Sequence, residues 1–175
     1  GIYNVDTIDC QFHHTVNVWK ENWDDEHRTV RPEDITNAAV ETAEEFPNKR
    51  VLVHYLQPHA PFIGPTGRHE LPTDVLDFWK RFKMGEIDVD PSVARKSVRE
   101  NLELVLDDIS RLFTIDGKSV LTADHGEMLG ERSGLLPTKK YGHPAGMHTP
   151  ELLEVPWFEH KSGSRRDVVT EEPVR

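Results

Sequence analysis

Two long stretches of the chain carry hydrophobic residues at the three- or four-residue spacing of an amphipathic helix. The first runs from Pro32, a favourable first helical residue, to Pro47. The second is capped by Asp90 and ends before Gly117, and a third helix is predicted over residues 72–84. The apolar positions of the two long stretches are Ile35, Ala39, Ala43 and Phe46, then Val98, Leu102, Val105, Ile109 and Leu112.

Shorter apolar runs predict strands, because they have too few residues for a stable helix. They lie at residues 50–56 and 119–123, with a possible further strand at 15–19. Helices that alternate with strands are typical of a parallel sheet with crossover helices. We therefore predict one α/β domain over residues 1–160 and a polar, frayed tail over residues 161–175.

Asp124 and His125 follow directly after the predicted strand at 119–123. In an open α/β sheet, ligands gather at the carboxyl ends of the strands, so an oxygen and a nitrogen donor there are well placed to hold a metal. Gly126 lets the backbone turn past the pair. Glu127 would accept hydrogen bonds from neighbouring amides or from an imidazole that is itself a ligand.

His59 stands between Pro58 and Pro61 in the loop that follows the strand at 50–56. The prolines make this loop rigid, and an imidazolium held there would donate to a substrate oxygen or protonate a leaving group. His54 lies inside the predicted strand and is interpreted as a packed core histidine.

Residues 133–150 are rich in glycine and proline and are predicted to form a long loop without secondary structure. Such loops are usually functional or disordered. His143 and His148 both lie in it, and either one would suit a site shared with Asp124 and His125; His143 is the preferred choice.

Composition excludes some classes of partner. The chain has 175 residues and a formal net charge of −10, which disfavours nucleic acid and anionic membrane surfaces as the main partner. A small phosphate or sulfate ester stays possible because one bound metal can dominate the local field. The single cysteine, Cys10, excludes an internal disulfide and a multi-cysteine zinc site.

Targeting features are few. No apolar run reaches membrane-spanning length and no signal-peptide pattern opens the chain, which slightly favours the cytoplasm while the compartment stays open. Because the first residue is Gly1, we expect a processed product or a fragment. The oligomeric state is left open.

The string Asp124-His125-Gly126-Glu127, followed by Leu129-Gly130-Glu131, resembles the sulfatase-like and phosphoethanolamine-transferase-like branch of the alkaline-phosphatase superfamily. His59 before Pro61-Phe62 and the segment ending in Val155-Pro156 resemble other parts of that family, so the likeness covers residues 50–158. It implies a three-layer α/β sandwich with a mostly parallel sheet, incomplete at its amino-terminal end.

The resemblance also implies a metal-dependent hydrolase or transferase of phosphate or sulfate esters. Asp124 and His125 would be the metal ligands, and His59 with His143 or His148 would bind the substrate. An imidazole in the ligand set favours zinc or manganese over calcium or magnesium.

The family's nucleophile is missing from the sequence. Cys10 lacks the sulfatase pattern around it, and Asp6 with Thr7 matches the family's spacing poorly. We therefore expect either the carboxyl-terminal part of a longer enzyme or a stand-alone, degenerate member of the family. Both would bind metal weakly and have little activity alone. The alternatives are a non-catalytic binding module and an unrelated metallohydrolase that would use His54 and His59 with the Asp124–His125 pair.

Overall fold

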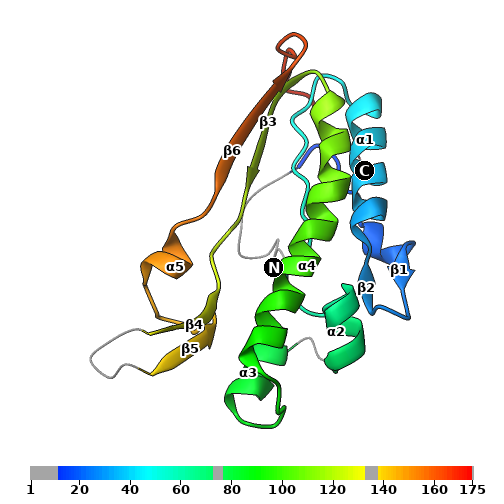
Figure 1. Ribbon diagram of the computed structural model, residues 1–175. Coiled ribbons are helices and arrows are strands. Elements are labelled where there is room, and N and C mark those ends of the chain that lie inside the picture. The colour runs from blue at the N-terminus through cyan, green and yellow to red at the C-terminus, as the bar shows by residue number, and fades with distance from the viewer. Residues whose placement is uncertain (1–11, 73–76, 133–137, 175) are drawn as a thin grey trace.

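The computed structural model describes residues 12–72, 77–132 and 138–174. Its helical half is built on α1 (Pro32–Glu45) and α4 (Pro91–Ile109), which lie side by side in Figure 1. Both begin at a proline, and Asp90 caps α4 by accepting a hydrogen bond of 2.7 Å from the Ser92 N–H. The 3₁₀ helix η2 (Ser110–Thr114) continues α4. Both long helices are confirmed.

One hydrophobic core lies between these helices and the chain that follows α1. Its buried members are Ala39, Val105, Ile109 and Leu112. Val105, Ile109 and Leu112 of the predicted apolar stripe are thus buried, but Leu102 is 42% exposed. The buried polar residues Ser97 and Asn101 complete the buried face of α4.

Within the described residues, the strands form three antiparallel pairs. β3 (Gly117–Thr122) pairs with β6 (Trp157–Ser162), and Leu121 lies opposite Phe158. β4 (Met128–Arg132) pairs with β5 (Lys139–Gly142), and β1 (Trp23–Asp24) pairs with β2 (Thr29–Val30). The predicted strand at 119–123 is therefore confirmed, and β6 begins directly after Pro156.

The predicted three-layer sandwich with a mostly parallel sheet is wrong. Each sheet of the described chain has two strands, and every pairing is antiparallel. The chain leaves β3, makes the β4–β5 hairpin and the short helix α5 (Pro150–Leu153), and returns along β3 in the opposite direction, as Figure 1 shows. A parallel neighbour would need a crossover connection, which the β3–β6 pair does not have.

Two further strand predictions are also corrected. Residues 50–56 are extended and alternate between exposed and half-buried positions, but no strand is assigned there within the described chain. Val53 and Tyr55 pack on the helical core, whereas Leu52 is 68% exposed. The segment 15–19 was predicted as a strand and instead leads into the 3₁₀ helix η1 (Val18–Lys20).

A second core surrounds α3 (Phe78–Lys83), a helix that lies within the predicted range 72–84, and this core lies near α2 (Pro65–Glu70). Its aromatic rings are those of Phe62, Phe78, Trp79, Phe82 and Tyr141. Tyr141 belongs to β5, so the prediction of a structureless loop over residues 133–150 is wrong for 139–142. Stacking of Tyr141 on Trp79, with ring centroids 6.1 Å apart, stabilises this hairpin.

The described part of the carboxyl-terminal segment runs back along α1. Arg166 donates to the backbone oxygens of Pro47, Ala43 and Phe46, which caps the end of this helix. The Val169 N–H donates to the Asn48 oxygen at 3.1 Å. Across the described residues, no helix combines the length and apolar character needed to span a membrane.

Candidate metal site

Three side chains that could hold a metal converge beyond the end of β3. His125, Glu127 and His143 each offer one ligand atom, and these atoms lie within 4.8 Å of one another. The rings of the two histidines have centroids 4.5 Å apart. His125 and His143 are 43% and 42% exposed, and Glu127 is 23% exposed, so the cluster opens to solvent.

Two glycines bring these side chains together. A Cβ atom on Gly126 would lie 1.9 Å from the Glu151 carbonyl oxygen, and the Gly126 N–H donates to Leu152 O at 2.9 Å. Gly142 has a φ of +76°, and a Cβ there would lie 2.9 Å from the Trp79 Cβ. Only glycine fits both positions without a shift of the backbone, so they fix where His125 and His143 emerge.

The hydrogen bonds of the cluster orient its rings. Nδ1 of His143 lies 3.3 and 3.2 Å from the two Glu127 carboxylate oxygens. Nδ1 of His125 donates to the Gly126 oxygen at 2.8 Å, which leaves Nε2 of His125 available to a metal. Glu127 can therefore act either as a third ligand or as the carboxylate that orients His143. The sequence identified Glu127 only in the second of these roles.

Asp124 stands beside the cluster but is not one of its three members. Its carboxylate is 79% exposed and lies 3.9 Å from Nε2 of His125. The same carboxylate accepts a hydrogen bond of 3.0 Å from the His125 N–H. Metal ligation by Asp124 therefore stays a prediction that would need a rotation of its side chain.

His59 lies in the loop between residues 50–56 and α2, and its ring centroid is 6.3 Å from that of His143. His148 is exposed and His54 is exposed, and neither belongs to the cluster within the described chain. The unrelated metallohydrolase that requires His54 therefore gains no geometric support. Cys10, Asp6 and Thr7, the weak matches to the nucleophile region, lie outside the described residues.

Asn101 on α4 holds the His59 loop in place. Its side-chain oxygen accepts from the Ile63 and Gly64 N–H groups at 2.8 and 3.2 Å. Its amide nitrogen donates to the His59 and Pro61 oxygens at 3.3 and 3.0 Å. Asn101 is fully buried, so these four bonds satisfy the whole side chain. A single polar residue on a helix gives no signal in the sequence from which this role could be predicted.

Glu100, next to Asn101 on α4, holds the start of α2 in a similar way. It accepts hydrogen bonds from the Thr66 N–H and hydroxyl, each at 2.7 Å. Burial works against ionisation of Glu100, but the two bonds from Thr66 and the nearby Lys96 charge outweigh it and hold its pKa below the usual range. The carboxylate therefore stays charged at neutral pH and supports the loop.

Two imidazoles and one carboxylate form a donor set that suits a catalytic divalent cation, because they leave further coordination positions open. Ligand atoms about 2.1 Å from a tetrahedral zinc ion lie about 3.4 Å apart. The ligand atoms now lie within 4.8 Å of one another, so binding would bring them closer by about 1.4 Å at most, which rotation of the two exposed histidine side chains can provide.

A comparison with curated proteins gives one relationship. The chain is 35% identical over 112 residues to the low-salt glycan biosynthesis sulfotransferase Agl7 of Haloferax volcanii. The aligned region covers 60% of this chain and 25% of that protein. The chain thus spans about a quarter of the length of this relative. No protein-family model matches the chain, and no solved structure matches it. The similarity gives a weak link to sulfate transfer and leaves the superfamily assignment without independent support.

Proposed function

We propose that this chain contributes a metal-binding half-site to an enzyme that transfers a sulfuryl group from a sulfate ester. The observation that carries the proposal is the convergence of His125, Glu127 and His143 within 4.8 Å. The partial similarity to a protein named as a glycan biosynthesis sulfotransferase supports sulfate over phosphate as the transferred group, and a glycan as the acceptor.

The two histidines and Glu127 would hold zinc or manganese, with Asp124 as a further ligand after rotation. The bound cation supplies positive charge that neutralises the oxygens of the ester. His59 would meet the same ester from its own loop. Its Nδ1 donates to the Ala60 oxygen at 2.6 Å, so Nε2 of the imidazolium form would be the group that donates to a sulfuryl oxygen. The hydrogen bonds of Asn101 to the His59 loop keep the His59 ring about 6.3 Å from that of His143.

The experiment compares sulfate and phosphate esters on the metal-loaded protein, extended to the length of the relative because this chain alone is expected to have little activity. We would incubate it with 4-nitrophenyl sulfate or 4-nitrophenyl phosphate and a methyl glycoside, and detect transfer by mass spectrometry and 4-nitrophenol by absorbance. Sulfated glycoside that depends on zinc or manganese and disappears in His143→Ala supports the proposal. His148→Ala is the matched control and should leave the product unchanged.

Turnover of the phosphate ester alone would contradict sulfate transfer, and release of 4-nitrophenol without sulfated glycoside would indicate hydrolysis. Metal binding without any turnover by a chain extended to the length of the relative would favour the non-catalytic binding module.

A further inference from the structure

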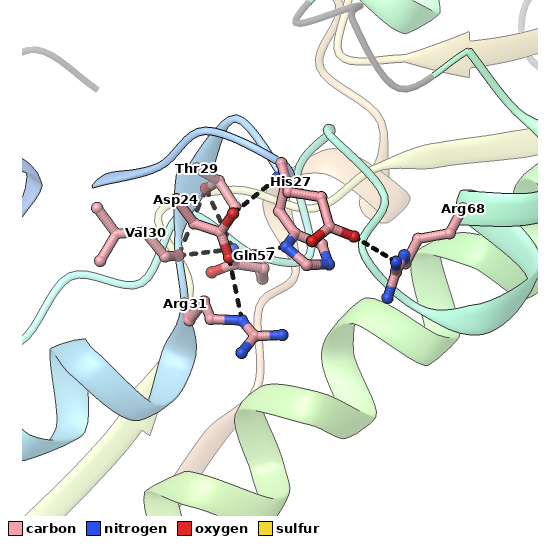
Figure 2. A network of polar contacts seen from close by, with 8 residues as sticks. Asp24, His27, Thr29, Val30, Arg31, Gln57 and Arg68 are labelled. Atoms are coloured by element: carbon pink, nitrogen blue, oxygen red, sulfur yellow. Dashed lines mark hydrogen bonds and ion pairs between the residues drawn. The ribbon is translucent and has the colours of Figure 1, made fainter. Parts of the chain in front are cut away.

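Besides the His143–Glu127 pair of the candidate metal site, His27 and Asp24 form a histidine–carboxylate pair at the β1–β2 turn. Nδ1 of His27 lies 2.7 Å from one Asp24 carboxylate oxygen, and the His27 N–H donates to the other at 2.9 Å. Arg31 contacts the same Asp24 carboxylate at 3.3 Å. The His27 side chain is only 6% exposed, so its ring is held in one orientation. Figure 2 shows this network.

The second ring nitrogen of His27 is left for another partner. The backbone hydrogen bond from His27 is the main reason that the pKa of Asp24 is lowered, so this carboxylate is ionised and Nδ1 carries the proton that it accepts. Within the described residues, Nε2 of His27 has no hydrogen-bond partner. This nitrogen is not among the fully enclosed atoms that lack a partner, so a ligand hydroxyl can reach it and donate to it.

His27 lines a cavity of about 210 Å³ together with Glu26, Pro61, Phe62, Ile63 and Arg68. Arg68 and Glu26 form an ion pair of 2.6 Å at the solvent side, where their side chains are 49% and 71% exposed. In Figure 2 the His27 ring lies between Asp24 and Arg68. The cavity therefore combines one buried imidazole, a donor–acceptor pair and an apolar wall.

The charges of this cavity favour a neutral ligand. Glu26 and Arg68 cancel each other, and an anion would have to displace Glu26 from Arg68 on a chain whose net charge is −10. A hydroxyl group can donate to Glu26 and accept from Arg68 at the same time. Neighbouring hydroxyls on one ring would reach His27, while the C–H face of the ring packs against Pro61 and Ile63.

The size of the cavity limits the ligand further. Sites for drug-sized ligands are typically about 300–1,000 Å³, so 210 Å³ suits one small ring and not an oligosaccharide. We propose that this cavity binds a single neutral sugar ring through His27, Glu26 and Arg68.

The cavity and the candidate metal site share one loop. His59 and Pro61 are two residues apart, so their Cα atoms lie within about 7 Å of each other. Asn101 bonds to the backbone oxygens of both residues. If the proposed sulfate transfer holds, on which this last step rests, the sugar in the cavity would belong to the acceptor.

The test measures sugar binding in metal-free protein, with a chelator present. Methyl glycosides of glucose, galactose and mannose would be titrated while the imidazole nitrogens of His27 are followed by ¹⁵N NMR, with sodium acetate and sodium sulfate as anionic comparators. We expect a saturable shift of the Nε2 signal with at least one glycoside. Arg68→Gln and Glu26→Gln should each weaken it at least tenfold, whereas Arg81→Gln, at another exposed Arg–Glu pair, should not.

A shift caused by the anions and not by the glycosides would overturn the proposal, as would no shift of His27 at any glycoside concentration up to about 0.5 M. Saturation that survives both Arg68→Gln and Glu26→Gln would place the sugar elsewhere and would also overturn it. Because no metal is present, each of these failures leaves the ester-transfer experiment to be judged separately.

Discussion

Two histidines of this molecule pair with carboxylates in opposite surroundings. His27 is 6% exposed and lies 2.7 Å from Asp24, whereas His143 is 42% exposed and lies 3.2 Å from Glu127. The first pair belongs to a network that ties the β1–β2 turn together, and the second lies beside another histidine at the open end of β3. A short buried bond contributes to folding, while a longer exposed one contributes little and leaves room for an ion.

This contrast separates two kinds of residue that look the same in a sequence. Substitutions in the buried networks should lower the free energy of unfolding, and substitutions in the exposed cluster should lower metal affinity instead. The following substitutions test the contrast, beginning with the largest expected loss of stability.

Asn101→Ala should have the largest effect, a loss of about 3 kcal/mol in the free energy of unfolding, because it leaves several buried backbone groups without partners. Urea denaturation measures the loss. Asn101→Asp keeps the acceptor but turns a carboxylate oxygen toward the His59 and Pro61 oxygens, so it should cost at least as much, while exposed Asn22→Ala should change little. A loss below about 1 kcal/mol for Asn101→Ala would mean that the His59 loop is held by other contacts.

Gly126→Ala should cost about 2 kcal/mol, because the new methyl group would collide with the Glu151 carbonyl oxygen 1.9 Å away. Thermal unfolding followed by circular dichroism checks this value. Gly146→Ala is a useful comparison, since open space surrounds that residue and its cost of about 1 kcal/mol would come from its positive φ alone. Equal stability of Gly126→Ala and the natural chain would contradict the close approach of α5.

Asp24→Asn should cost about 1 kcal/mol at neutral pH, and the cost should depend on pH. The pKa of Asp24 is lowered in the folded chain, so its stabilisation is present above the ordinary value of about 4 and is lost as the pH falls below it. The stabilities of Asp24→Asn and the natural chain should therefore converge in acid. Asp25→Asn, at the exposed neighbour, should show no such convergence, and a constant difference for Asp24→Asn would argue against an ionised Asp24–His27 pair.

Glu127→Gln should change the free energy of unfolding by less than about 0.5 kcal/mol but weaken zinc or manganese binding at least tenfold. Urea denaturation and isothermal calorimetry measure the two quantities on the same sample. Glu154→Gln, at an exposed position outside the cluster, serves as the control. A large loss of stability with unchanged metal affinity would reverse the contrast between the two histidine–carboxylate pairs.

The sequence predicted those parts of the fold that depend on local patterns. Helical spacing located α1 and α4, Asp90 was identified as a cap, and a short apolar run located β3. The alternation of helices and strands predicted a parallel sheet, which is wrong. The strand that pairs with β3 depends on the path of the chain through residues 123–156, and this path cannot be inferred from local patterns. β-Rich composition at 50–56 predicted a strand, but a strand also needs a hydrogen-bonded neighbour.

The candidate site was predictable to a similar degree. His125, His143 and His59 were identified by their loops and by the resemblance, and in the structure the His143 ring lies near both of the others. Glu127 and Asn101 were missed as a possible ligand and as the anchor of the His59 loop, because both roles depend on contacts between distant segments. His27 gave no signal at all, since its burial and the cavity that it lines with residues 61–63 depend on segments far apart in the sequence.

The central claim is that His125, Glu127 and His143 form a metal site, and metal content with calorimetric affinity tests it most directly. The measurement compares the natural chain, the His125→Ala/His143→Ala variant and the His148→Ala control. The account predicts about one zinc or manganese ion per chain in the natural protein and in the control, and none in the double variant. Equal metal binding by all three proteins, or none by any, would contradict it.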